Sequence, residues 1–292
     1  MHVFAPRDDG MLAIGVLGAG RLGSALAAAL VAAGAGRVAI GARRLDAVRT
    51  LASTLKIEAA PPATLVERCD LVFLTVPDTA IESTAETLPW RPGQAAVHCS
   101  GALGLDVLRA AAGRKASTGC FHPLQTFPAE GTTSEAPGLF RGITCGVESS
   151  DAPLSARLEA IAAGLGARVI RLEGVDRALY HAAAVLVSND VVALAAAARR
   201  VWARAGLPAE SGREALAPLL VAAAGNVSRL SPEEALTGPV ARGDVATVER
   251  HLRALEVEPE LREVYRRLAL ELLQLDLGQV PAVTAELRRV LG

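Results

Sequence analysis

A glycine-rich turn constrains the fold of this chain more than any other feature. Residues 18–23 read GAGRLG and join a buried apolar run, 12–17, to an alanine-rich segment, 22–33, that has helical periodicity. In dinucleotide-binding turns the three glycines permit the tight turn, admit the pyrophosphate and let helix and strand pack closely. We therefore expect a cofactor loop here rather than a plain strand–helix turn. Its expected members are Gly18, Ala19, Gly20, Arg21, Leu22 and Gly23.

Short apolar runs alternate with helical stretches as far as residue 172. Strands are expected over 37–40, 71–76, 95–99, 117–121, 143–147 and 167–172, and helices over 45–55 and 154–164. This alternation predicts an α/β fold, a Rossmann-type doubly wound sheet. After Glu173 the pattern is helical, broken only by glycine and proline. We expect a flexible tail (1–10), a Rossmann domain (11–172) and an all-α domain (173–292).

Composition argues against several classes of protein. Thirty basic and thirty-one acidic residues leave a net charge of -1, and only 3% of residues are aromatic. Neither a phosphate-binding field nor a stacking platform for bases is evident, so no nucleic-acid partner is expected. The four cysteines form no Cys-x-x-Cys pair and the N-terminus has no apolar signal core, which favours a reduced, cytoplasmic protein.

One apolar segment, 178–198, is about long enough to span a bilayer. Its interior contains His181, Ser188, Asn189 and Asp190. A central aspartate alone costs ~2.5–3.5 kcal/mol on insertion, and alanines offset little of that cost. We therefore expect a buried helix of a soluble protein and no membrane partner.

The end of the second expected strand indicates which dinucleotide binds. An NAD site usually has an acid about twenty residues after the glycine turn, to hold the ribose 2′-hydroxyl. Here residues 41–44 read GARR, and the first acid is Asp46. Arg43 and Arg44 can pair with a 2′-phosphate, which favours NADP(H); alternatively, they form the solvated start of a helix. Val76 and Pro77, where the strand over 71–76 ends, complete the expected cofactor site.

Four further segments resemble a known family. They read VHCSGALGLDVL, CFHPLQTF, LYHAAAVLVSNDVVAL and LTGPVARGD, in this order along the chain. The sequence looks like the Rossmann-like bacterial proteins that carry a DUF2520 domain and are labelled as NADP oxidoreductases or likened to F420-dependent ones. More distantly it resembles the 6-phosphogluconate dehydrogenase-like group. That resemblance implies a Rossmann domain before a helical domain, with a small-molecule substrate between them.

Two candidate substrate-binding segments follow expected strands. Ser100 and Gly101 come directly after the strand over 95–99, where a doubly wound sheet forms its ligand crevice. A simple Ser-Gly turn is the alternative. His122 precedes a proline after the next strand and resembles the His-Pro segment of prephenate dehydrogenases, in which the histidine contacts the reacting hydroxyl. A structural histidine that caps a loop is the alternative for His122.

The helix expected from residue 175 carries His181, Ser188 and Asn189 in one sector roughly 100° wide. Polar groups on an apolar face need partners, which favours a site over satisfied core hydrogen bonds. In related dehydrogenases and reductases this helix carries a lysine with an asparagine four or eight residues later. His181 aligns with that lysine and Asn189 lies at plus eight, whereas Val185 occupies plus four. We expect His181, steadied by Asn189, to donate the proton, while His122 and Ser100 orient the acceptor.

A loop in the helical half offers a cation for substrate. Arg242 lies in the glycine-rich segment 237–244 and can bind a carboxylate through two hydrogen bonds. An ion pair with Asp244 is the alternative role. The long apolar segments of this half exceed what one Rossmann domain can cover, so a homodimer is expected.

These features together predict an NADP(H)-dependent oxidoreductase that reduces a C=O group of a small carboxylate, with a ketopantoate-like 2-oxoacid as the specific expectation. Reduction of C=N, oxidation of a hydroxy acid and F420-linked NADP chemistry are alternatives within enzymes. A non-catalytic NADP-binding sensor or scaffold is the alternative outside them. Turnover of NADPH with a panel of 2-oxoacids separates these classes.

Overall fold

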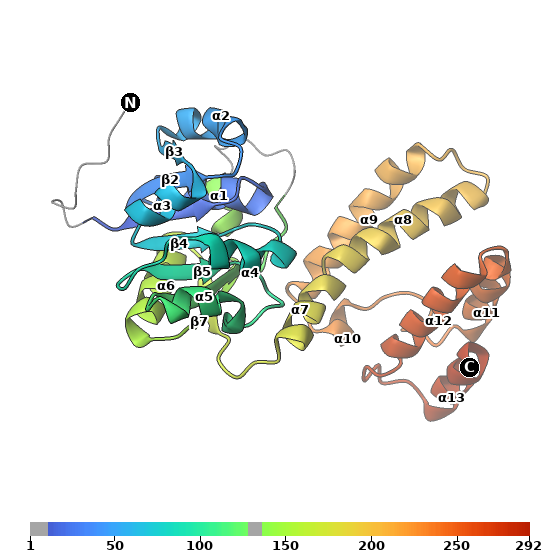
Figure 1. Ribbon diagram of the computed structural model, residues 1–292. Coiled ribbons are helices and arrows are strands. Elements are labelled where there is room, and N and C mark those ends of the chain that lie inside the picture. Colours follow the sequence, from blue (N-terminus) through green and yellow to red (C-terminus); the bar gives the residue numbers. More distant parts are fainter. Residues whose placement is uncertain (1–10, 128–135) are drawn as a thin grey trace. The chain divides into compact units, whose positions relative to one another are not determined.

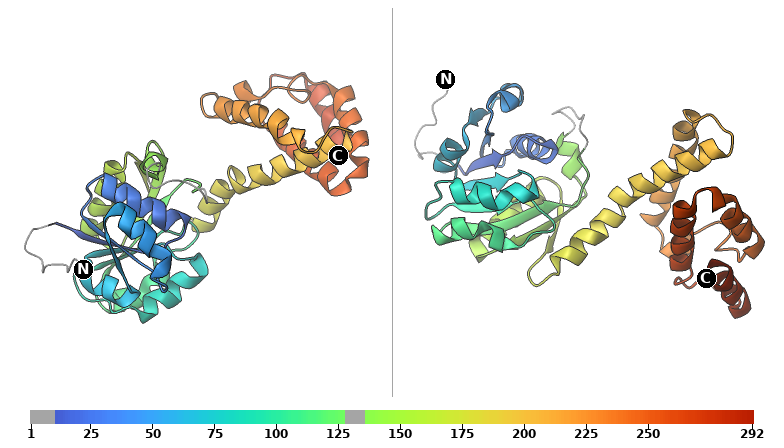
Figure 2. Two further views of the ribbon diagram at one scale, coloured as in Figure 1. Left: turned by 90° about the horizontal axis from the view of Figure 1, so that it is seen from above. Right: turned by 45° about the vertical axis from the view of Figure 1, so that its right-hand side comes forward.

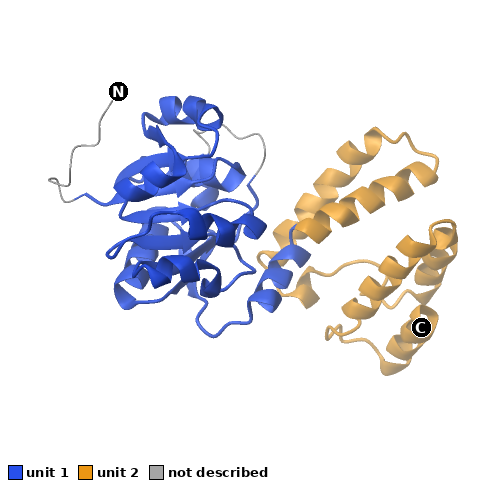
Figure 3. Cartoon of the chain, in the orientation of Figure 1, with its two compact units in different colours: residues 1–188 blue, residues 189–292 orange. Residues whose placement is uncertain are grey.

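The computed structural model describes residues 11–127 and 136–292. The chain forms two compact units, Met1–Ser188 and Asn189–Gly292, which Figure 3 shows in two colours. The tail predicted over residues 1–10 lies outside the described residues.

The first unit is built on a mostly parallel sheet, as the alternating pattern predicted (Figure 1). Its strand order is β3-β2-β1-β4-β5-β6-β7-β8 in the described part of the chain, and only the β6–β7 pairing is antiparallel. The strands are β1 (Ala13–Leu17), β2 (Arg37–Gly41), β3 (Glu58–Ala60), β4 (Leu71–Leu74), β5 (Ala95–His98), β6 (Ser117–Pro123), β7 (Thr144–Ser149) and β8 (Arg168–Arg171). Strand β3, only three residues long, was not predicted.

Helices cover both faces of this sheet (Figures 1 and 2). Alternate strand residues enter two cores: Phe73 packs with α1 and α6 on one face, and Val72 packs with α3 and α4 on the other. The helices of this part are α1 (Arg21–Ala32), α2 (Asp46–Leu55), α3 (Pro62–Arg68), α4 (Asp78–Thr87), α5 (Arg109–Gly113) and α6 (Ala152–Gly164). The four cysteines are free and buried.

The topology determines where a ligand crevice forms. Strand β1 pairs with β2 on one side and with β4 on the other, so the winding of the chain reverses at β1. Strands β1, β4, β5 and β6 are parallel, and their carboxyl ends therefore lie at one edge of the sheet. Ligands of doubly wound sheets bind at this edge, beside the reversal point.

The second unit is entirely helical in its regular elements, as predicted. Its C-terminal helices enclose a small core that includes Val248, Leu252, Leu273 and Leu287. The helices are α8 (Asn189–Arg204), α9 (Ser211–Val227), α10 (Pro232–Ala235), α11 (Val245–Ala254), α12 (Pro259–Leu272) and α13 (Pro281–Leu291).

The boundary between the units differs from the expected one. Strand β8 ends at Arg171, close to the expected domain end at Leu172, but the first unit continues through α7 (Arg177–Leu186) to Ser188. Side chains of α7 hold it to the sheet: Arg177 donates to the Leu103 carbonyl oxygen at 2.9 Å, and Tyr180 contacts β6 through His122. The first turns of the predicted helical half therefore fold with the Rossmann-type unit.

The expectation of one buried helix over 178–198 was wrong. The helix is interrupted at Val187 and Ser188, where the Ser188 hydroxyl donates to the Ala184 carbonyl oxygen at 2.6 Å. Helix α7 has no buried residue, and Ala197 is the buried residue of α8. By length and composition, 177–204 is the one described stretch that could cross a bilayer. The apolar residues of this stretch are exposed because few other residues of the chain pack against them.

Candidate active site

The glycine loop between β1 and α1 leaves an open backbone surface. Gly18 has a φ of +123°, and a Cβ there would lie 2.8 Å from the Thr75 backbone. A Cβ at Gly23 would lie 2.1 Å from the Gly18 carbonyl oxygen, so helix and loop pack too closely for any side chain. A Cβ at Gly20, the N-cap of α1, meets nothing within 4 Å, and no side chain caps this helix. The first-turn N–H groups of α1 are thus free for an anion.

One pocket of about 650 Å³ brings the expected cofactor residues together. The part of its lining that was predicted comprises Gly18, Ala19, Gly20, Arg21, Leu22, Arg43, Val76 and Pro77. Gly23 packs behind the loop against Thr75. Cys99, at the carboxyl end of β5, lines the same pocket, so the glycine loop and the end of β5 face one space.

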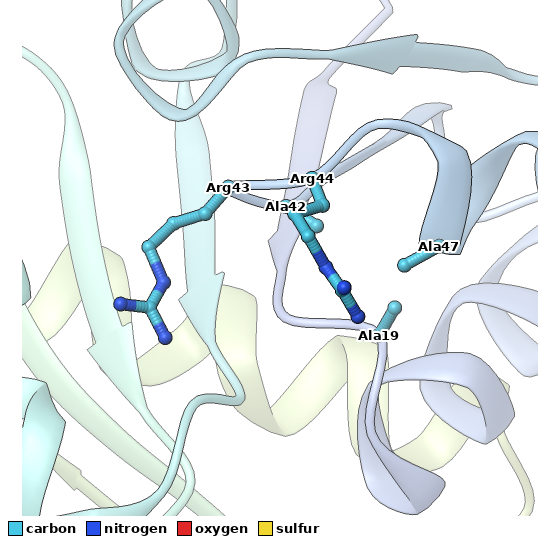
Figure 4. Close-up of a pocket in the computed structure, with 5 residues that line it drawn as sticks. All are labelled: Ala19, Ala42, Arg43, Arg44 and Ala47. Atoms are coloured by element: carbon cyan, nitrogen blue, oxygen red, sulfur yellow. The ribbon is translucent and has the colours of Figure 1, made fainter.

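Two arginines border an adjacent pocket of about 510 Å³, lined by Ala19, Ala42, Arg43, Arg44 and Ala47. In Figure 4 the Arg44 side chain extends toward Ala19 of the glycine loop, and the Arg43 side chain extends to the other side of the segment after β2. Both side chains are exposed, and neither forms a salt bridge within the described residues, whereas Arg49 pairs with Asp46 at 2.8 Å. The two guanidinium groups remain available to a phosphate.

Two imidazoles meet at Gly101, directly after β5. A Cβ on Gly101 would lie 2.6 Å from His122 Cε1 and 2.9 Å from His181 Cδ2. The two ring centroids are 6.2 Å apart. His122 comes from β6 and His181 from α7, so the fold brings these two predicted residues to one place.

Tyr180 is a member of this cluster that the sequence did not identify as a site residue. Its hydroxyl lies 2.9 Å from His122 Nδ1, with the ring centroids 5.5 Å apart. A Cβ at Gly146 of β7 would lie 2.6 Å from the Tyr180 hydroxyl, so the phenol is accommodated over a glycine. The available signal was the pairing of Tyr180 with His181 in a chain that has only two tyrosines.

Burial keeps His122 neutral. Desolvation, together with the nearby His181 and Arg177 groups, lowers the pKa of His122 to about 4, although Asp78 acts in the opposite direction. At neutral pH one ring nitrogen of His122 therefore carries a hydrogen and the other is a bare acceptor.

The structure gives Ser100 a different setting from the expected one. The Ser100 hydroxyl lies 2.6 Å from Asp78 Oδ2 and accepts from the backbone N–H groups of Ala102 and Leu103. Its one hydroxyl hydrogen points to the carboxylate, so this side chain organises the turn after β5. This contact favours the Ser-Gly turn interpretation.

Asn189 and Arg242 belong to the second unit, whereas His122 and His181 belong to the first. Asn189 is the first residue of α8. Arg242 is exposed in the segment before α11, and Asp244 caps α11 by accepting from the Thr247 N–H. Their roles beside His181 and at a substrate carboxylate stay predictions.

Replacing Gly101 with alanine tests the cluster directly. Gly101 is not among the glycines with positive φ, so the added methyl acts by crowding His122 and His181 and not by backbone strain. We expect about 100-fold lower turnover, the usual scale for reacting groups displaced by about 1 Å. NADPH affinity, measured by cofactor titration, should be unchanged.

Gly113→Ala is the matched control, because a Cβ there meets nothing within 4 Å. Equal turnover by the two glycine variants would contradict a role for the paired imidazoles.

Comparisons with known proteins match two family models to successive parts of the chain. Residues 13–100 match the family described as NADP oxidoreductase, coenzyme F420-dependent, and residues 143–272 match DUF2520, a domain of unknown function. No relative was found among curated proteins.

Solved structures share the fold over most of the chain. A candidate NADP oxidoreductase from Bacteroides fragilis is 27% identical, with a TM-score of 0.72, covering 90% of this chain and 98% of that one. A 1-pyrroline-5-carboxylate reductase from Streptococcus pyogenes is 16% identical (TM-score 0.62; 90% and 99% covered). A reductive aminase from Aspergillus terreus, in complex with NADPH and ethyl-5-oxohexanoate, is 16% identical (TM-score 0.60; 96% and 92% covered).

The DUF2520 match begins at the end of the Rossmann-type sheet and covers β7, α6 and β8 as well as helices of the second unit. The earlier match covers the glycine loop, the two arginines and the turn after β5. The segment that holds the glycine loop therefore matches the NADP oxidoreductase, coenzyme F420-dependent, family model, and the segment that begins just before β7 matches the DUF2520 model.

Proposed function

We propose that this protein is an NADPH-dependent reductase that adds hydride to the C=O group of a small carboxylate. One observation carries the proposal: the glycine-loop pocket extends to Cys99 at the end of β5, and two residues later Gly101 lies against the paired imidazoles of His122 and His181. A cofactor pocket and a pair of proton-carrying groups are thus formed in succession along one sheet edge.

The residues present fit NADP(H). Gly20 leaves space at the start of α1 for a pyrophosphate. Arg43 and Arg44, which form no salt bridge in the described part of the chain, offer two guanidinium groups for a 2′-phosphate. Gly41 ends β2 where an NAD site usually presents a carboxylate. When bound, NADPH supplies the hydride.

The protein must then supply one proton. Hydride addition to the carbonyl carbon moves the C=O π electrons to oxygen, and the resulting alkoxide takes a proton from the His181 ring, which is reprotonated from solvent. His122 stays neutral and donates a hydrogen bond that orients the same oxygen. We propose His181 as the proton donor and His122 as the group that orients the acceptor.

Substrate identity is the finer part of the proposal. We retain a ketopantoate-like 2-oxoacid as the first compound to test, with Arg242 as the proposed carboxylate partner. Reduction of C=N has support from the fold shared with the pyrroline-carboxylate reductase and the reductive aminase. Hydroxy-acid oxidation is the same chemistry in reverse, and F420 as redox partner is suggested by the family description.

Steady-state oxidation of NADPH tests the proposal. Wild-type protein is assayed with a panel of 2-oxoacids, simple ketones and cyclic imines, and the Gly101→Ala variant serves as the site control. Substrate-dependent oxidation that this variant loses would support a reductase. Tight NADPH binding without turnover of any compound would favour a sensor or scaffold.

We further propose that the protein is a cytoplasmic homodimer that associates through the second unit. Helices α8 and α9 form an apolar groove of about 590 Å³, whose lining includes Val192, Leu194, Leu219 and Leu220, and all four are exposed. Exposed apolar patches of this kind usually mark association. Association through this groove would cover the exposed apolar residues of α8, which form part of the apolar stretch 177–204.

Leu219→Arg should convert the dimer to a monomer, as measured by light scattering at micromolar concentration. Leu219 is 68% exposed in the single chain, so the substitution does not disturb the fold of the protomer. Val257→Arg is the control, because Val257 is 66% exposed but lies outside the groove. A monomeric wild-type protein would show the inference to be wrong.

A further inference from the structure

We infer that Tyr180 fixes His122 as the tautomer with its hydrogen on Nε2, so that the site selects a neutral carbonyl oxygen over a protonated imine. The inference rests on the proposed reductase function and deepens it by naming the substrate class. Tyr180 acts through His122 and is therefore a positioning residue.

The direction of the Tyr180–His122 hydrogen bond follows from what each group can offer. Partial burial raises the pKa of Tyr180 to about 12, so the phenol keeps its hydrogen. Within the described residues, His122 Nδ1 is the one hydrogen-bond partner of the phenol oxygen, at 2.9 Å. If Nδ1 carried the hydrogen, the Tyr180 O–H group would have no protein acceptor. Leaving this partly buried donor without a partner would cost free energy. Tyr180 therefore donates, and Nδ1 accepts.

The other nitrogen of His122 faces the site. His122 Nε2 would lie 2.8 Å from a Cβ on Gly101, so this atom borders the space that the glycine leaves open. In the part of the chain that the structure describes, no protein group forms a hydrogen bond with Nε2. With Nδ1 occupied by Tyr180, the Nε2–H group points to the ligand as a donor.

A hydrogen-bond donor at this position discriminates between two classes of substrate, carbonyl compounds and protonated imines. A carbonyl oxygen has two lone pairs and accepts from Nε2–H, whereas the N–H of a protonated imine needs an acceptor and would meet another donor. Charge adds to the discrimination. The Arg177 and His181 groups disfavour a proton on His122, and their combined effect on its pKa is larger than the opposing effect of Asp78. The same two groups disfavour a cationic ligand beside His122. The cluster therefore favours ketones and 2-oxoacids.

Nitrogen-15 NMR of the histidine rings tests the tautomer without requiring turnover. In the wild-type protein His122 should show a protonated Nε2 and an unprotonated Nδ1, and Tyr180→Phe should abolish this preference. Tyr265→Phe is the matched control, because Tyr265 forms a 2.9 Å hydrogen bond with His251 Nδ1 in the second unit. A protonated Nδ1 in the wild type, or an unchanged tautomer in Tyr180→Phe, would overturn the assignment.

Substrate class is tested by binding as well as by rate. With NADP⁺ present, oxamate, an inert carbonyl-bearing carboxylate, should shift the His122 Nε2 resonance, and proline, a cyclic ammonium carboxylate, should not. Tyr180→Phe should lower the ratio of carbonyl to imine kcat/KM by about 10-fold, the scale of one hydrogen bond.

The possible failures are distinguishable. A shift with proline alone, or with neither compound, would refute carbonyl selection. If no compound is turned over but oxamate still shifts the His122 Nε2 resonance, the reductase function is refuted and the tautomer assignment is not.

Discussion

Replacing His181 with alanine is expected to lower kcat for carbonyl reduction by about 100-fold, the usual scale for lost acid catalysis. The ring lies beside Gly101, across from His122, and we propose that it gives the proton that completes the hydroxyl. NADPH affinity should not change, because His181 is not part of the glycine-loop pocket. Single-turnover rates and cofactor titration measure the two quantities separately.

Two further variants identify the donor. His122→Ala should chiefly raise KM, since the neutral His122 ring orients the acceptor, and His251→Ala in the second unit should leave both constants unchanged. Normal turnover by His181→Ala would refute the assignment of His181 as the proton donor.

Charge reversal of Arg43 and Arg44 together is expected to weaken NADPH binding by at least ~100-fold while leaving NADH binding nearly unchanged. Only NADPH carries the 2′-phosphate, and each hydrogen bond to a charged group contributes about 1.5–3 kcal/mol. The effect should fall with added salt, because both side chains are exposed.

Arg49→Glu controls for general electrostatics, since Arg49 lies on α2, shortly after Arg43 and Arg44, but pairs with Asp46 at the surface. Fluorescence titration of the wild type and both variants with each cofactor gives the six dissociation constants needed. Equal affinity of wild-type protein for NADPH and NADH would refute the assignment.

Local sequence patterns were sufficient to predict the fold class and the residues that line the glycine-loop pocket. The apolar run before GAGRLG forms β1, and the predicted loop follows it. A Cβ on Gly18 would collide with Thr75 and a Cβ on Gly23 would collide with the Gly18 carbonyl oxygen, so both positions require glycine. The two arginines after β2 lie beside that loop because consecutive parallel strands end at one edge. The three-residue strand β3 was not predicted, because its sequence, EAA, lacks the alternating or β-branched pattern that is typical of strands.

The chemistry beyond the cofactor depends on contacts between distant segments. Tyr180 and His122 are 58 positions apart, and Ser100 and Asp78 are 22 apart, so neither contact follows from local spacing. Helical periodicity placed His181 and Asn189 on one face, but that argument assumed a continuous helix. The hydroxyl of Ser188 bonds back to Ala184 at the interruption, and the two residues belong to different units.

Gly101 and Gly146 have a consequence for recognising this chemistry in other genomes. Each borders the histidine–tyrosine cluster at a point where a methyl group would collide with a ring or hydroxyl atom at 2.6 Å. A sequence profile that scores only the reactive side chains would therefore accept chains in which a neighbouring alanine blocks them. A diagnostic pattern should weight these two missing side chains as heavily as His122, Tyr180 and His181.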